Sequence, residues 1–167
     1  MGERTQLSVA VVRDDLELCR VSIHYQWGYG RVMLMDALHI GWSLEFRPWW
    51  HHTADEAEQV AQDIIGYAAG VENFVEWDNR YHENLTEMFK WSDNNDGFAE
   101  LTVPLSEDTV KGLELRLYDH AGTACTLAEY VQRSESGEYA DSAFRHHFKA
   151  LLADIGVELI EKAGVVA

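Results

Sequence analysis

Apolar and polar residues alternate at the start of the chain, and this alternation predicts a β-hairpin. Leu7, Val9 and Val11 recur at every second position of residues 6–13, which is the period of a strand with one buried face. Two aspartates follow as a turn, and residues 16–27 continue with their more apolar side chains at odd positions. We therefore expect two antiparallel strands joined by a tight turn.

The next apolar segment fits two periods at once. A strand-like alternation is formed by Ile40, Trp42, Leu44 and Phe46. A helical stripe is formed by Val32, Met35, His39 and Trp42. We interpret the second half as a strand, leave residues 32–39 open between helix and strand, and expect Trp27 and Trp42 to pack in the core.

Capping signals and apolar stripes predict two longer helices and one short helix. Thr53 and Glu56 form a capping box at the start of a helix over about residues 53–68. A second box, Thr126 with Glu129, opens a short helix to about residue 132. The last helix covers about residues 141–162. Its expected core face consists of Phe144, Phe148, Leu151, Leu152, Ile155 and Leu159.

The order of the strands predicts an α+β fold. Residues 85–91 and 98–103 flank a polar turn and read as a second hairpin, and residues 113–118 as a further strand. Because strands come as hairpins rather than alternating singly with helices, we expect an antiparallel sheet covered by the helices. The length of 167 residues and the lack of a Pro/Ser/Gly-rich linker predict a single domain over residues 1–167.

Acidity changes the functional picture most. The net charge is −16, and residues 53–108 contribute −12 of it, from fourteen acidic and two basic residues. This charge disfavours direct binding to nucleic acid or to an anionic membrane, because both need a basic face. It favours a basic protein partner, although a merely solvated acidic face is the ordinary alternative. A homo-oligomer is compatible with the sequence.

Neither a signal-peptide core nor a membrane span is visible in the sequence. Charged residues interrupt the first seventeen positions, and no stretch approaches the roughly 20 apolar residues of a spanning helix. The two cysteines, Cys19 and Cys125, are too few for a disulfide scaffold. We expect a cytoplasmic protein with reduced thiols.

Aromatic residues lie among the acids and next to them, and together they predict an acidic protein-interaction module. Aromatic anchors supply short-range binding energy, and the carboxylates attract a basic partner from a distance. Acidic phage and mobile-element proteins that block restriction or CRISPR enzymes are similar in composition, and in composition only. An inhibitor that mimics nucleic acid is therefore the favoured function. The expected partner-binding residues are Glu72, Glu76, Asp78, Glu83, Glu87, Asp93, Asp96, Trp49, Trp50 and Trp77.

Two alternatives rest on other residue types. Imidazole is the commonest metal ligand, so a metal-binding protein or a small metal-dependent enzyme is one alternative. Its candidate ligands are His51, His52, His82 and His120. The second alternative is a domain with a pocket for a small ligand, lined by the tryptophans and tyrosines of residues 27–50. The sequence contains no P-loop, nucleophile elbow or complete dinucleotide fingerprint, so no cofactor is expected and an enzyme is the less favoured class.

Overall fold

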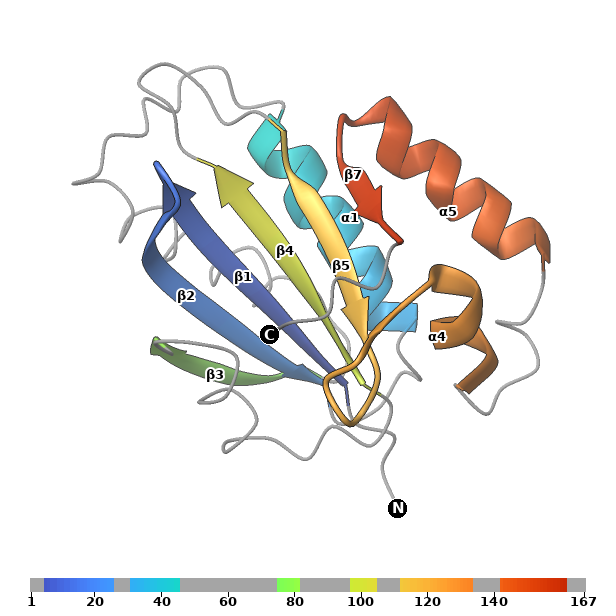
Figure 1. Cartoon of the computed structure of the whole chain (residues 1–167), viewed down its shortest axis with the longest axis horizontal. Helices are drawn as coiled ribbons and strands as arrows, with labels where there is room; N and C mark the ends of the chain where they lie inside the picture. The colour runs from blue at the N-terminus through green and yellow to red at the C-terminus, as the bar shows by residue number, and fades with distance from the viewer. Residues whose placement is uncertain are drawn as a thin grey trace.

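The computed structural model describes residues 5–25, 31–45, 75–81, 97–104, 112–133 and 142–161. Within these segments the chain forms a seven-stranded sheet and three helices (Figure 1). The α+β class expected from the sequence is confirmed.

The N-terminal hairpin is confirmed. Strand β1 (Thr5–Arg13) pairs antiparallel with β2 (Leu16–Tyr25). The turn residues Asp14 and Asp15 have φ values of 49° and 62°. Left-handed backbone at both turn positions matches the right-handed twist of the flanking strands, and aspartate tolerates it better than most residues.

The sheet is mixed rather than antiparallel, which corrects the expected topology. Its other strands are β3 (Val75–Tyr81), β4 (Phe98–Pro104), β5 (Glu114–Tyr118), β6 (Ala124–Cys125) and β7 (Glu158–Ile160). The order is β3-β2-β1-β4-β5-β6, and β7 also pairs with β5. The pairs β1–β4 and β5–β7 are parallel. Parallel neighbouring strands are joined by a long crossover connection. Hairpin signals in the local sequence do not reveal such a connection.

Strand β4 shows why the second predicted hairpin is wrong. Its residues 98–102 pair with β1 on one edge and with β5 on the other. A strand has only two hydrogen-bonding edges, and those of residues 98–102 are taken by β1 and β5. Residues 85–91 lie outside the described residues.

Residues expected to form a strand belong instead to helix α1 (Arg31–Glu45). Met33, Leu34, Ala37 and Leu38 are buried in the core, at the spacing of one helix face. This face packs against β1 and β4, behind the sheet in the view of Figure 1. The helix therefore overrides the strand-like alternation as far as Glu45. Trp42 is 53% exposed, so its expected place in the core is also wrong.

The short helix begins as its capping box predicts. Thr126 precedes α4 (Leu127–Arg133), and its Oγ1 accepts a hydrogen bond of 3.2 Å from the backbone N–H of Glu129. The Glu129 carboxylate in turn accepts one of 2.8 Å from the backbone N–H of Thr126. The exchange satisfies two N–H groups that have no partner within the helix.

The last helix is shorter than expected. Helix α5 (Ser142–Asp154) ends before Gly156, whose φ of 74° is left-handed. The Gly156 and Val157 N–H groups bond back to Ala153 and Leu152, which closes the helix end. Leu159 therefore lies on β7 rather than on a helix. The helix predicted at 53–68 lies outside the described residues. None of the three described helices has the length and apolarity that crossing a membrane requires.

Two left-handed glycines provide a test of the packing around β4. Gly97 has a φ of 85°, and a Cβ there would lie 2.2 Å from the backbone oxygen of Tyr118. Gly112 has a φ of 70° with nothing within 4 Å of such a Cβ. We expect Gly112→Ala to cost about 1 kcal/mol of unfolding free energy, and Gly97→Ala about 3 kcal/mol or more. Urea unfolding of both variants measures the difference, and equal losses would contradict the close approach of β4 to β5.

Candidate functional site

Polar side chains are buried on the face of the sheet that is turned away from α1. Ser8 is fully buried, and Arg20 and Glu100 are 5% and 8% exposed. They come from β1, β2 and β4, three adjacent strands. Charged side chains are almost never buried unless they are paired, so this cluster is the most distinctive chemical feature of the described residues.

A β-bulge brings a fourth residue to the cluster. In the β1–β2 register, Val11 pairs with Cys19 but Val12 pairs with Glu17, so Leu18 has no partner. In a regular strand, residues three positions apart point to opposite faces. The extra residue restores Glu17 to the same face as Arg20, which a regular register would forbid.

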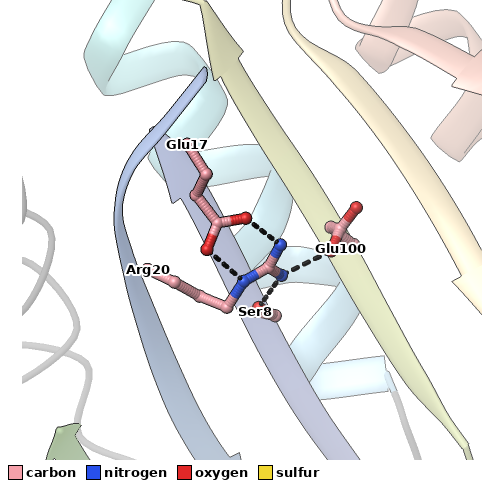
Figure 2. A network of polar contacts seen from close by, with 4 residues as sticks. All are labelled: Ser8, Glu17, Arg20 and Glu100. Atoms are coloured by element: carbon pink, nitrogen blue, oxygen red, sulfur yellow. Dashed lines mark hydrogen bonds and ion pairs between the residues drawn. The ribbon is translucent and has the colours of Figure 1, made fainter. Parts of the chain in front are cut away.

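The Arg20 guanidinium is held by three side chains (Figure 2). Its Nε donates to Glu17 Oε1 at 3.0 Å and its Nη2 to Glu17 Oε2 at 2.6 Å, a two-pronged contact with one carboxylate. Its Nη1 donates to Ser8 Oγ at 2.7 Å and to Glu100 Oε2. Such charge-assisted, bidentate contacts fix geometry as well as supplying energy.

The electrostatics of the cluster favour a structural role. Burial alone lowers the pKa of Arg20, but its hydrogen bonds and charge interactions with Glu17 and Glu100 outweigh burial and raise that pKa above its ordinary value. The guanidinium therefore stays charged, and it is poorly suited to give up a proton as a general acid. Because it is already engaged by two carboxylates, its chemistry is that of a clamp across three strands rather than of a receptor for an anion.

An aromatic pair lies on the same face as the clamp. The rings of Phe98 and Tyr118, opposite each other on β4 and β5, stack with centroids 4.6 Å apart. Burial raises the pKa of Tyr118, and the charge of Glu100 raises it further. The phenol is therefore neutral at physiological pH and contributes packing to this face.

A second buried acid lies on the opposite face, where α1 meets the sheet. Asp36 is 2% exposed and accepts a hydrogen bond of 2.8 Å from Tyr25 Oη. Burial raises the pKa of Asp36, and the Tyr25 hydrogen bond and the charge of His39 only partly oppose this shift. Ionising the Asp36 carboxyl in this buried position costs free energy.

Only three of the expected partner-binding residues lie in a described element, β3. In the backbone register, Glu76 and Asp78 are opposite His24 and Ser22, and Trp77 between them is opposite Ile23. These three residues are therefore consecutive on β3, which lies at one edge of the sheet. Outside the described residues lie Glu72, Glu83, Glu87, Asp93, Asp96, Trp49 and Trp50.

The metal hypothesis gains no geometry from the described residues. His120 is exposed in the turn between β5 and β6. The other candidate ligands, His51, His52 and His82, lie outside the described residues. Within the described part of the chain, no three His, Cys, Asp or Glu side chains converge in a way that would hold a metal ion.

In comparisons with family models, curated proteins and solved structures, no significant match to this chain was found.

Sequence reasoning missed the Arg20 clamp. Arg20 and Glu100 are separated by 80 positions, and the bulge that aligns Glu17 has no sequence signature. One signal was present: Arg20 and Ser8 both occupy the polar positions of the predicted hairpin, so they share a face of the sheet.

The clamp predicts unequal costs for two arginine substitutions. Arg20→Met leaves the buried Glu100 without its partner and should cost about 3–5 kcal/mol of unfolding free energy. Arg116→Met removes a half-exposed pair with Glu114 at 2.8 Å and should cost less than about 1 kcal/mol. Chemical denaturation of both variants provides the comparison. A loss for Arg20→Met as small as that for Arg116→Met would show that the clamp is dispensable.

The raised pKa of Asp36 predicts how stability changes with pH. A carboxyl whose folded pKa lies above its unfolded value stabilises the fold fully at acidic pH, and that contribution is lost as pH rises through the folded pKa. Asp36→Asn removes the titration but keeps an oxygen that can accept the Tyr25 hydrogen bond. The unfolding free energy of the wild type should therefore fall relative to Asp36→Asn as pH rises above about 4. Parallel curves from pH 3 to 7 would contradict the shift.

Proposed function

We propose that this protein is an acidic protein-interaction module that binds a basic nucleic-acid-handling protein and competes with nucleic acid for its surface. The observation that carries the proposal is the surplus of −12 within residues 53–108. Carboxylates that replace phosphates on a basic surface would inhibit such a partner without any catalytic step.

One acid of residues 53–108 is paired within the described elements: Glu100 contacts Arg20, which also pairs with Glu17. The described elements also contain the pairs Arg116–Glu114 and Lys149–Glu161, whose acids lie outside residues 53–108.

The distribution of charge along the chain supports the proposal. The described segments contain fourteen acids and eight bases, a net charge of −6. The other segments contain fifteen acids and five bases, a net charge of −10. Most of the surplus therefore belongs to segments other than the strands and helices described above.

The negative charge of the protein predicts a characteristic salt dependence of binding. Attraction between a strongly acidic and a basic protein raises the association rate, and salt screens it over about 10 Å at 0.1 M ionic strength. Binding should accordingly weaken steeply as salt increases, and acidic proteins should not compete.

Substitution of expected partner-binding acids tests the proposal against general electrostatics. The probes are a type II restriction endonuclease and a guide-loaded CRISPR nuclease, each assayed for DNA binding at low salt. We expect the wild type to inhibit at least one of them. Glu72→Gln, Glu76→Gln, Glu83→Gln and Glu87→Gln combined should weaken that inhibition by about tenfold or more, because four attractive charges are lost.

The matched control changes net charge by the same amount elsewhere. Asp14→Asn, Asp15→Asn, Asp154→Asn and Glu158→Gln alter four exposed acids of the hairpin turn and the C-terminal elements. This variant should inhibit within about threefold of the wild type. Equal losses in the two variants, or no inhibition of either enzyme by the wild type, would contradict the proposal.

A further inference from the structure

Helix α1 presents a stripe of large side chains on its outer side. Met35 is partly buried and still packs against the core, His39 is exposed and Trp42 is 53% exposed. These residues are spaced i, i+4 and i+7, so they lie along one face of the helix. The helical pattern in the sequence contained the same three residues. In the structure it lies opposite the fully buried residues of α1, and of the three only Met35 is recorded as packing against the core.

The inner side of α1 holds this stripe in place. Met33, Leu34 and Ala37 are buried against the sheet. Near the end of the helix, Gly41 approaches Val157 so closely that a Cβ at Gly41 would lie 2.9 Å from Val157 Cγ2. The next residue, Trp42, is turned about 100° around the axis from this contact. The indole is therefore displayed by a helix whose orientation is fixed by packing.

An exposed tryptophan on a rigid helix is suited to anchoring a partner. Tryptophan is enriched among the residues that dominate binding energy at interfaces. Methionine beside it adapts its shape to an opposing surface. Residues spaced i, i+4 and i+7 are also the ones by which a helix binds in a groove of a partner protein.

We propose that the outer stripe of α1, formed by Met35, His39 and Trp42, is the anchor of the partner interface, and that the basic partner stacks an arginine side chain on the Trp42 indole. This inference rests on the proposed function for the charge of the partner. The face of an indole attracts cations more strongly than that of any other side chain, and arginine is the cation most often found there. Long-range attraction by the acids would then deliver the partner, and Trp42 would hold it.

Charge argues against a second copy of the chain as the occupant. Each copy carries −16, so two copies repel each other, most strongly at low salt. A cationic protein surface meets no such penalty, and its arginine is complementary to both the net charge and the indole.

The test uses fluorescently labelled octa-arginine and octa-lysine as defined probes, with binding followed by anisotropy at low salt. We expect Trp42→Ala to weaken octa-arginine binding by about fivefold, with a smaller loss for octa-lysine and an intermediate one for Trp42→Phe. The control is Leu16→Ala, because Leu16 is 65% exposed at the hairpin turn and its loss also leaves net charge unchanged. It should bind within about twofold of the wild type.

The outcomes separate this inference from the proposed function. If Trp42→Ala binds like the wild type while the variant at residues 72, 76, 83 and 87 loses binding, the anchor is wrong and the acidic module stands. If Trp42→Ala loses binding and that charge variant does not, the anchor stands and the proposed role of the acids fails. Light scattering that shows a dimer dissociated by Trp42→Ala would overturn the inference in favour of self-association. Circular dichroism and thermal unfolding confirm that each variant is folded.

Discussion

The buried guanidinium of Arg20 is the interaction that constrains the described fold most strongly. A charge can be removed from water only when partners replace its hydration, and here these partners come from β1, from β4 and from β2 itself. Ser8 and Glu100 must therefore flank the same point in space, which places β1 between β2 and β4. An apolar residue at position 20 would place no such requirement on the neighbouring strands. The clamp accordingly contributes specificity of arrangement in addition to stability.

Features that depend on neighbouring residues were predictable from the sequence, and features that depend on distant ones were not. The hairpin follows from alternation and two aspartates, and the start of α4 follows from the reciprocal bonds of Thr126 and Glu129. Helix α1 was misread because its residues 40–45 satisfy a strand period as well, and only packing on the sheet decides between the two. The end of α5 was placed too late because apolar spacing continues through Leu159, while Gly156 turns the chain into β7.

The candidate sites divide in the same way. Charge could be counted from the sequence, so the acidic module could be stated as a hypothesis without the structure. The pairing of Glu100 with Arg20 could not, because it joins positions 80 residues apart. Trp42 was assigned to the core from its apolarity alone, whereas its exposure depends on which side of α1 meets the sheet. Composition thus supports a hypothesis about the charge of a partner, and three-dimensional packing decides which side chains are exposed.

Parallel pairing of β1 with β4 has a consequence for how the molecule folds. Val9 aligns with Leu101, so the centre of the sheet cannot form until the chain has closed a loop of more than half its length. Closing so long a loop costs entropy before any contact repays it, and such topologies fold slowly. The β1–β2 hairpin is local and is expected to form early, presenting an unpaired strand edge until β4 arrives. Mutual repulsion between chains of high like charge opposes the pairing of such exposed edges during that interval.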